Sequence, residues 1–279
     1  MTLRLTKRLA EAVEPLDGLA EPAQEAVQKV PKPLRDALDG VWLGNPLHPA
    51  LTDVPVGAWS AAFLLDLVGS PAADGALAVG ILGALPAAAT GLNDWSHLKG
   101  EERRVGTAHA LLNTAGLTLN LLSLGARKAG LRGLGRLLSM TAYGGVLVSA
   151  HLGGELSFGF GVRVNRTAFE SPRERYAPVC EESELEGGKL VGVELEGESV
   201  LVSRSEETGE VCAIAGTCTH LGGPLPQGER EGDTVICPWH GSRFDLCSGA
   251  VESGPAVFPQ PRYEARVRAG KVEVRAAKD

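Results

Sequence analysis

The sequence has little positive charge and lacks the marks of a secreted protein. Its 27 Lys and Arg are outnumbered by 34 Asp and Glu, which gives a net charge of −7. This balance leaves no basic footprint for nucleic acid, so nucleic acid is excluded as a partner. At the N-terminus the basic residues are followed by Glu11 and Glu14 rather than by a continuous apolar stretch. We therefore expect no secretory signal peptide.

Cysteine and aromatic residues are also scarce. The five cysteines stand at positions 180, 212, 218, 237 and 247 and form no regularly spaced framework. This pattern fits a reducing compartment better than a secreted, disulfide-built domain. Cys212 and Cys247 are expected to be small buried hydrophobic residues. Aromatic residues make up 5% of the chain against 36 glycines, a composition that favours closely packed helices.

The chain does contain apolar segments with few charges. Four of them, each about 17–19 residues long, approach the length needed to cross a hydrocarbon core. They are rich in Ala, Gly, Ser and Thr, small residues that let membrane helices approach closely. A soluble four-helix bundle would show a charged face along each helix, whereas only Asp53 and Asp66 interrupt these segments. We predict an all-α four-helix transmembrane bundle over residues 44–160, with spans at 51–69, 75–92, 107–125 and 138–154.

Basic residues near these spans predict the orientation in the cell membrane. More of them lie on the side of the N-terminus, which also holds everything after residue 154, than on the opposite side. The positive-inside rule then predicts a multi-pass protein whose C-terminal part is cytoplasmic. The first group is Lys29, Lys32, Arg35, Lys99, Arg103, Arg104, Arg163 and Arg166, and the second is Arg127, Lys128, Arg132 and Arg136.

Three further regions complete the organisation. Residues 1–43 form a polar, amphipathic helical lead, which either lies on the membrane surface or packs against other helices. Residues 161–172, with Gly161 and Pro172, form a linker. Residues 173–279 change to the alternation of short strands and predict an all-β antiparallel sandwich. The expected strands lie at 189–193, 199–203, 211–214, 234–237, 262–267 and 271–274.

Two short segments carry the most specific chemistry in the chain. Cys218 and His220 form a C-x-H motif, and Cys237 and His240 form a C-x-x-H motif, each in a loop rich in Gly and Pro. Each loop offers one thiolate and one imidazole, ligands that suit iron. Two such loops can hold a two-iron cluster with both Cys on one iron and both His on the other, the ligand set of a Rieske 2Fe–2S centre. A structural zinc site accepts the same four residues, but zinc sites usually pair Cys with Cys and His with His.

From these residues onward the chain resembles the Rieske ferredoxin-like family. The shared motifs are C-T-H-L-G from residue 218, C-P-W-H-G-S-R-F-D from residue 237, then Gly249 and the Gly254–Pro255 turn. The resemblance covers roughly residues 173–279. It implies that Cys218 and Cys237 ligate an inner iron, and that His220 and His240 ligate an outer, exposed one. It also implies a cluster environment made of Leu221, Gly222, Trp239, Gly241, Ser242 and Pro255.

The loop residues also indicate a branch of that family. High-potential members carry an extra Cys in each ligand loop and join the two as a disulfide, whereas this chain has Gly222 and Trp239 at those positions. Ser242 follows His-Gly as it does in the high-potential branch, where its hydroxyl donates a hydrogen bond to a bridging sulfide. We expect an intermediate potential, and we expect Leu221 and Trp239 to be buried against the cluster.

A second resemblance covers roughly residues 44–165. Segments 47–57, 90–94 and 151–154, together with His109, are similar to a prokaryotic four-helix integral-membrane family of unassigned function. This resemblance implies a topology and no established chemistry.

Polar residues near the span ends leave three interpretations open. They are histidines hydrogen-bonded to loops, or a quinone pocket built from His48, Asp53, His109 and His151, or a haem b between His109 and His151. Any of these groups falls on the side of the membrane from which the cluster domain emerges.

Taken together, these features predict a membrane-anchored Rieske 2Fe–2S electron-transfer protein. It would pass single electrons between a membrane donor, such as quinol, or a soluble donor and a redox partner protein. A terminal oxygenase needs a further mononuclear iron site, typically two His and a carboxylate, but no His occurs after His240. The alternatives are a ferredoxin component that feeds an oxygenase, and a redox sensor or scaffold whose membrane domain is only an anchor.

Overall fold

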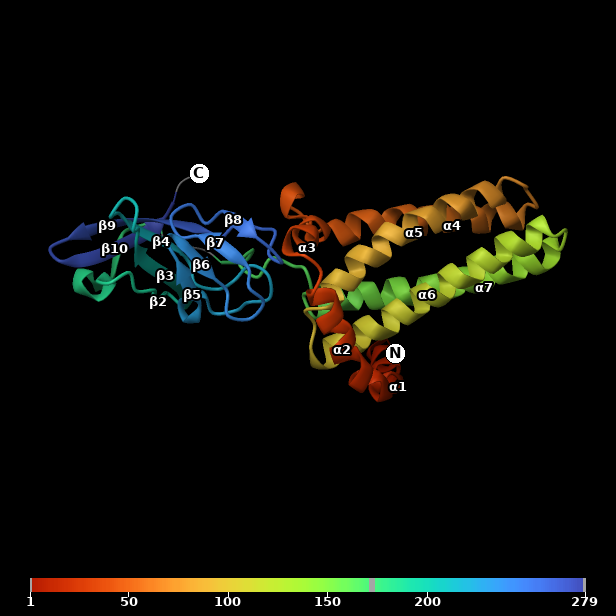
Figure 1. The fold of residues 1–279 in the computed structure, drawn as a ribbon, viewed down its shortest axis with the longest axis horizontal. Coiled ribbons are helices and arrows are strands. Elements are labelled where there is room, and N and C mark those ends of the chain that lie inside the picture. Colours follow the sequence, from red (N-terminus) through yellow and green to blue (C-terminus); the bar gives the residue numbers. More distant parts are fainter. Residues whose placement is uncertain (1, 171–173, 278–279) are drawn as a thin grey trace. The chain divides into compact units, whose positions relative to one another are not determined.

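The computed structural model describes residues 2–170 and 174–277, shown as a ribbon in Figure 1. The chain folds into two compact units. A helical unit comprises Met1–Leu34 and Pro46–Val162, and a β unit comprises Arg35–Asn45 and Arg163–Asp279. The layout of helices followed by a β sandwich confirms the predicted fold class. Pro172, near the end of the expected linker, lies outside the described residues.

Seven α-helices are found within the described residues, because the N-terminal lead contributes three in addition to the four that were expected. The lead contains α1 (Thr2–Ala12), α2 (Asp17–Gln28) and α3 (Lys32–Asp39). The long helices are α4 (Leu47–Leu67), α5 (Ala73–Trp95), α6 (Gly100–Lys128) and α7 (Arg132–Gly154). A π-helical turn, Glu155–Gly159, continues α7. Each expected span falls largely within one long helix.

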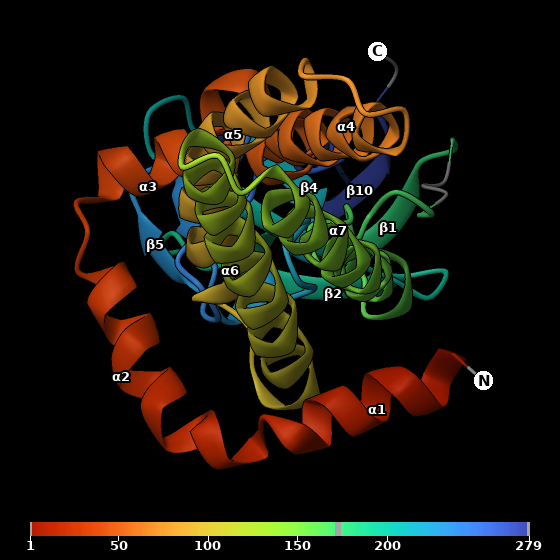
Figure 2. The same ribbon diagram turned by 90° about the vertical axis from the view of Figure 1, so that its right-hand side faces the viewer.

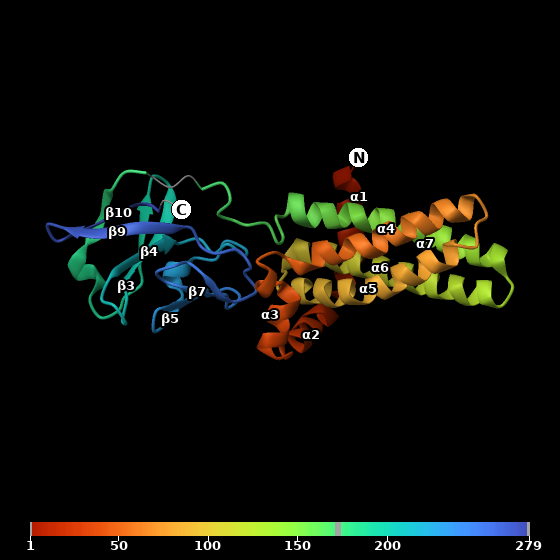
Figure 3. The same ribbon diagram turned by 90° about the horizontal axis from the view of Figure 1, so that it is seen from above.

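The four long helices form two hairpins, α4 with α5 and α6 with α7, which can be followed in Figures 2 and 3. Their shared core contains Trp59, Ala62, Leu77 and Val146. Glycine allows the close approach, since a Cβ on Gly80 would collide with the Trp59 ring. Small residues therefore bring the hairpin helices together, as the composition predicted.

The lead packs against the helical unit, so the packed alternative describes it. Helix α1 contacts α6, and Ala10 lies in a cluster with Val105 and Leu152. At the start of α6, Arg104 pairs with Asp17, at 2.7 Å between Nη2 and Oδ2. Thr6 and Ala10 of α1 are buried, and Figure 2 shows α1 passing the end of α6.

Among the described helices, two are long and apolar enough to cross a membrane, α4 and α5. Helix α6 begins with Gly-Glu-Glu-Arg-Arg and ends with Arg-Lys, which lowers its mean hydropathy. By length and composition alone, the helices of the α4–α5 hairpin qualify as membrane spans, whereas those of the α6–α7 hairpin do not.

The β unit consists of two antiparallel sheets. The six-stranded sheet has the order β1-β10-β9-β4-β3-β2 and the four-stranded sheet the order β5-β6-β7-β8. All six predicted strands occur, and the four strands that the sequence did not predict are β1, β5, β7 and β8, of which three have only three residues. The bounds are β1 Ala177–Glu181, β2 Val191–Leu195, β3 Glu198–Arg204, β4 Val211–Ala215, β5 Glu229–Glu231, β6 Thr234–Ile236, β7 Arg243–Asp245, β8 Val251–Ser253, β9 Arg262–Arg268 and β10 Lys271–Ala276.

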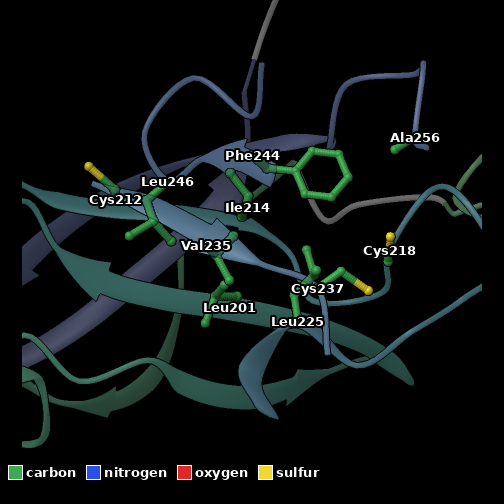
Figure 4. Close-up of a cluster of buried hydrophobic side chains, with 10 residues drawn as sticks. All are labelled: Leu201, Cys212, Ile214, Cys218, Leu225, Val235, Cys237, Phe244, Leu246 and Ala256. Carbon is green, nitrogen blue, oxygen red and sulfur yellow. The ribbon is translucent and has the colours of Figure 1, made fainter. Parts of the chain in front are cut away.

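A buried cluster fills the space between the ligand loops and the sheets (Figure 4). It includes Leu201, Ile214, Val235 and Phe244, all fully buried. Leu201 and Ile214 come from β3 and β4 of the six-stranded sheet, and Val235 and Phe244 come from β6 and β7 of the four-stranded sheet, so both sheets contribute to the cluster. The thiols of the two expected cysteine ligands lie at one edge of this cluster.

The expectation that Cys212 and Cys247 are unpaired hydrophobic residues is wrong, because the structure joins them as a disulfide. The bond connects β4 to the turn that follows β7, and Cys212 is buried in the core cluster. Thirty-five residues separate the two cysteines in sequence. Spacing alone could not reveal this pair, since the antiparallel sheets bring the two segments together.

Residues 35–45 belong to the β unit, although they precede the long helices in the chain and fall mostly in the expected lead. The end of α3 and a 3₁₀ turn, Val41–Leu43, form this segment. We call it the strap. The strap contacts the β unit at Gly254, next to Pro255.

Candidate metal centre

Three loops at one end of the β unit carry the expected site residues. The first, 216–224, follows β4, and the second, 237–242, joins β6 to β7. The third, 254–261, joins β8 to β9 and contains the Gly254–Pro255 turn. The sequence brings the three loops to one end because each connects strands that end on that side.

The two ligand loops are copies of the same turn. In the first, the Cys218 N–H donates to the carbonyl of Gly223, and the Gly222 N–H donates back to the carbonyl of Cys218. In the second, Cys237 and Gly241 make the corresponding bonds, at the same sequence spacing. The fifth residue of each turn has a positive φ, +81° at Gly222 and +73° at Gly241, which favours glycine. Local sequence thus shapes both loops before any ligand is bound.

The thiols of Cys218 and Cys237 are brought together by these turns. Both residues are almost fully buried, at 1% and 3% exposure. A Cβ on Gly223 would lie 2.7 Å from the Cys237 sulfur and 3.2 Å from Cγ of Trp239. The sequence interpretation placed Gly222 opposite Trp239, whereas Gly223 is the residue that occupies this position.

The imidazoles of His220 and His240 also face one another. Their ring centroids are 5.2 Å apart and the ring planes are nearly perpendicular. His220 is buried and His240 is partly exposed, so the expected exposure of both rings is found for one of them. Segment 163–167 runs along the first loop, where the Arg166 N–H donates to the carbonyl of Thr219.

Trp239 differs from expectation as well. Its side chain is 54% exposed, whereas we expected it to be buried against the cluster. The ring lies at the tip of the second loop, and only its inner edge meets Gly223. Leu221, in the equivalent part of the first loop, is partly buried.

The donor set fits a group with two metal ions better than a single ion. The thiols form one pair and the imidazoles another, while no three His, Cys, Asp or Glu side chains in the described residues gather around a single ion position. A tetrahedral zinc site would need all four ligands around one point. A two-iron cluster with one pair of ligands on each iron matches the observed pairing.

Hydrogen bonds surround the ligand sulfurs. The Cys237 thiol raises the pKa of Cys218, with burial adding to the shift, and the same contact lowers the pKa of Cys237 to about 6. The Cys218 sulfur also accepts hydrogen bonds from the His220 N–H and the Ser242 hydroxyl. The Cys237 sulfur accepts from the backbone N–H groups of Trp239 and His240. These donors stabilise negative charge on sulfur, as a cluster requires.

The third loop is held by Ser242, which the sequence analysis named, and by Thr219, which it did not name. Ser242 accepts a hydrogen bond from the Ala256 N–H at 3.0 Å, and the Thr219 hydroxyl donates to the carbonyl of Phe258 at 2.8 Å. Pro255 is buried in this loop. Thr219 could have been noticed as a polar residue between two ligands, whereas the partner of Ser242 depends on the fold.

The polar residues of the helical unit are not arranged as the quinone hypothesis or the haem hypothesis expected. His109 faces His48, with ring centroids 6.5 Å apart, and not His151. The reason is helical geometry: Ser149 and Gly153, four residues apart, hold the His109 ring, so residue 151 points to another face of α7. Asp53 is exposed and lies away from this pair.

His48 and His109 are held in the same way in their two hairpins. The Nδ1 of His48 lies 2.9 Å from the carbonyl oxygen of Ala87, and the Nδ1 of His109 lies 2.8 Å from that of Ser149. A carbonyl only accepts, so each Nδ1 carries the proton. A glycine, Gly91 or Gly153, makes room for each ring. These two histidines are hydrogen-bonded, but to carbonyls of the helices α5 and α7 and not to loops as the first interpretation expected.

Two family models match the chain. The model described as Rieske [2Fe-2S] domain matches residues 175–264, and the model described as Predicted membrane protein (DUF2231) matches residues 44–166. The matches coincide with the β unit and with the four long helices. They confirm both resemblances stated from the sequence.

Several curated proteins are similar to about a third of the chain. Apoptosis-inducing factor 3 of Mus musculus is 34% identical over 102 residues, which are 37% of this chain and 16% of that protein. The chain therefore spans only a small part of this relative. Ferredoxin CarAc of Metapseudomonas resinovorans is 34% identical over 101 residues, 36% of this chain and 92% of the ferredoxin.

A solved structure shows the same partial coverage. The complex of reduced oxygenase and oxidized ferredoxin in carbazole 1,9a-dioxygenase contains a chain that is 31% identical, with a TM-score of 0.35, covering 37% of this chain and 95% of that one. The family models and the ferredoxin together establish the family. The chain belongs to the Rieske [2Fe-2S] family through its β unit, and its long helices match the model described as Predicted membrane protein (DUF2231).

Proposed function

We propose that this protein is a membrane-anchored electron carrier that passes single electrons between a donor and a redox partner protein. The observation that carries the proposal is the pair of matching turns, which set two buried thiols beside two imidazoles. Relatives described as ferredoxins, such as CarAc, support the electron-transfer role of the β unit.

The proposed ligands are Cys218, His220, Cys237 and His240. When bound, a 2Fe–2S cluster supplies one-electron oxidation and reduction. The protein then has three tasks: the buried thiols hold the inner side, the Ser242 hydroxyl and backbone N–H groups neutralise charge on sulfur, and His240 reaches the surface. The exposed Trp239 beside His240 offers an apolar contact for a docking protein, so electrons would enter and leave at this edge.

A ferredoxin that serves an oxygenase is the more specific form of this function. The relative CarAc, matched over 92% of its length, supports it. In this form of the function, the oxygenase with its own mononuclear iron site is the partner protein that receives the electrons. A redox sensor that uses its helices only as an anchor is the remaining alternative.

We further propose that all four long helices cross the membrane. Many large apolar side chains on these helices point outward, including Leu64 and Leu82 on the first hairpin and Leu122 and Leu137 on the second. Several polar residues of α6 and α7 point inward instead, among them the buried Asn120, Ser123 and Ser149. An apolar outside with a polar inside suits lipid better than water.

The side on which the β unit lies is open to a direct test. The excess of basic residues on its side of the spans supports the cytoplasm. The Cys212–Cys247 disulfide favours the opposite side, because disulfides are rare in reducing compartments. Cys180 is a partly exposed free thiol in the β unit. A membrane-impermeant maleimide added to intact cells labels Cys180 only if the β unit lies outside the cytoplasm.

For the helical unit, a haem or quinone would have to be found near His48 and His109, since these two rings face one another. An optical spectrum of the dithionite-reduced protein tests this proposal through the haem α-band, and solvent extraction tests it for quinone. A spectrum without the haem band and an extract without quinone would contradict this proposal. The two histidines would then have only the structural role of their hydrogen bonds.

Electron paramagnetic resonance of the detergent-purified, reduced protein tests the main proposal. We expect the low average g of a Rieske cluster, its loss in His220→Ala, and its retention in His109→Ala. A protein without this signal would not be an electron carrier of this kind. Re-oxidation of the reduced cluster by a purified oxygenase component separates a ferredoxin from a sensor, since a sensor would not turn over with it.

A further inference from the structure

The third loop of the cluster site is bound from outside the Rieske sheets. The Asp36 carboxylate in the strap accepts hydrogen bonds from the Ser253 hydroxyl at 2.9 Å and from the Gly254 N–H at 3.0 Å. Both bonds fix the residues that lead into Pro255. Asp36 is 217 residues from Ser253 in sequence, so only the fold makes this contact.

A buried ion pair holds the other side of the same turn. Arg163 donates through Nη2 to the carboxylate of Asp39 at 3.1 Å and through Nη1 to the carbonyl of Pro255 at 2.7 Å. The side chains of Arg163 and Asp39 are 7% and 2% exposed. Burying two charges is costly unless they are paired and hydrogen-bonded, so this arrangement constrains the turn closely.

Packing in the turn leaves no space for rearrangement. A Cβ on Gly254 would lie 2.9 Å from an Asp39 carboxylate oxygen and 3.0 Å from Cγ2 of Val41. The strap therefore touches the backbone of the turn directly. Movement of the strap would move the turn with it.

The turn is also connected to a cluster ligand. Ala256, the residue after Pro255, donates its N–H to the Ser242 hydroxyl at 3.0 Å, and this hydroxyl is close enough to the Cys218 sulfur to lower the pKa of that thiol. Accepting from Ala256 orients the Ser242 hydroxyl, because its single proton is then left for the sulfur. Hydrogen bonds to the sulfurs are one of the determinants of the potential of an iron–sulfur cluster.

We propose that Asp36 and the Asp39–Arg163 pair are positioning residues of the metal centre, which hold the Gly254–Ala256 turn so that Ser242 keeps its hydrogen bond to Cys218. The proposal rests on the proposed electron-transfer function and adds a determinant of the reduction potential. The strap reaches the site through the turn and does not touch the cluster. Releasing the turn weakens a hydrogen bond to sulfur, which disfavours the more negative reduced state and lowers the potential.

Two substitutions of equal charge separate positioning from electrostatics. Asp36→Asn keeps one oxygen that can accept from the Gly254 N–H, and its amide N–H can donate to the Ser253 hydroxyl, whereas Asp36→Ala keeps neither bond. We expect a lower midpoint potential in Asp36→Ala than in Asp36→Asn. We also expect amide hydrogen exchange at 254–258 to be about tenfold faster in the alanine variant, since the turn opens more often. Exchange is measured on the full-length protein and does not depend on electron-transfer activity.

A matched control lies in the same unit. The Asp233 carboxylate likewise accepts from a serine hydroxyl, that of Ser205, and from a backbone N–H, that of Glu206, but it is outside the cluster loops. Asp233→Ala and Asp233→Asn should have the same potential as each other. In a Ser242→Ala background, the two Asp36 variants should also share one potential, because the hydrogen bond through which they act has been removed.

Equal potentials for Asp36→Ala and Asp36→Asn in the parental background would overturn the inference, even if exchange differed. If Asp36→Ala does not assemble a cluster, Arg163→Lys replaces it: the charge is kept, the second hydrogen bond is lost, and the potential must fall. An unchanged potential in Arg163→Lys also overturns the inference. A parent protein without a Rieske signal would instead contradict the proposed function itself, before any variant is compared.

Discussion

The β unit and the helical unit treat their polar residues in opposite ways. In the β unit, thiols, imidazoles and the Ser242 hydroxyl converge from three loops on one small volume. In the helical unit, several polar side chains are paired within the helices: Asp66 pairs with Arg127, and His48 and His109 bond to backbone carbonyls. Convergent donors form a ligand site, whereas mutually satisfied donors hold helices together.

The ion pair of the helical unit shows this second use most clearly. Asp66 and Arg127 have side-chain exposures of 0% and 1%. Ser139 donates to Asp66, Arg127 also reaches Asp74, and a Cβ on Gly135 would crowd the Arg127 side chain. The network joins residues from all four long helices. The network therefore holds the two hairpins together. Its polar groups bond to one another and are not offered to a ligand.

The sharpest way to test the contrast is to add one methyl group to each unit. Gly223→Ala places a Cβ 2.7 Å from the Cys237 sulfur, so we expect most of the Rieske signal and visible absorbance to be lost. Gly144→Ala, on α7, meets nothing within 4 Å and should keep the full signal. Iron content and electron paramagnetic resonance of both purified proteins give the measurement. Equal cluster content in the two variants would contradict the assigned site.

The next largest effect is expected in the helical unit. Asp66→Ala leaves Arg127 buried without its main partner, which should lower the free energy of unfolding by about 3–5 kcal/mol. Unfolding in mixed micelles, followed by circular dichroism, measures the loss. The control is Asp53→Ala in the same helix, whose exposed carboxylate should contribute less than about 0.5 kcal/mol. A similar loss in both variants would show that the network is not what holds the hairpins.

The disulfide gives the corresponding test in the β unit. Cys212→Ser should lower the stability of this unit by about 2–4 kcal/mol, because the unfolded chain regains freedom. The cluster signal should persist at low temperature, since neither residue is a ligand. Thermal bleaching of the visible bands measures the shift. Cys180→Ser, which removes a free thiol, is the control and should bleach at the parental temperature.

The smallest expected effect depends on pH. Burial raises the pKa of Glu170 from 4.5 to about 7, and Glu198 adds to the shift. The folded state therefore holds a proton that the unfolded state has released, so the free energy of unfolding falls between pH 4.5 and about 7. Glu170→Gln removes this loss and should be more stable by about 1 kcal/mol above pH 7, a value reduced for partial exposure.

Below pH 4.5 the Gln variant and the parent should unfold alike, because Glu170 is protonated in both states there. Melting temperatures of the full-length protein from pH 4 to pH 8 trace the difference. Glu207→Gln, in an exposed turn, should follow the parental curve at every pH. A difference in melting temperature between Glu170→Gln and the parent that stays constant with pH would mean that the substitution acts through packing instead.

Much of the fold was accessible from the sequence because it is encoded locally. The apolar segments predicted the four long helices, and the alternating segments predicted six strands. The short strands β5, β7 and β8 were missed because three residues carry too little pattern to be recognised. The position opposite Trp239 was assigned to Gly222 instead of Gly223, an error of one residue that the turn geometry corrects.

Longer-range features were not accessible in this way. The haem hypothesis paired His109 with His151, yet the ring of His48 faces His109, because two residues along a helix reverse the direction of a side chain. The disulfide was missed since its cysteines have no motif. The strap was missed because Asp36 and Asp39 look like ordinary surface acids of a polar helix.

By itself, the sequence determined the ligand types, their spacing and the glycines that shape both ligand turns, because these properties depend on residues within a few positions of one another. Tertiary structure alone decided which polar groups would meet. It joined Asp36 to Ser253, Asp66 to Arg127 and Cys212 to Cys247 across 217, 61 and 35 residues. Such pairs are selected by packing, since burying a charge or a donor is favourable only where the folded chain supplies its partner.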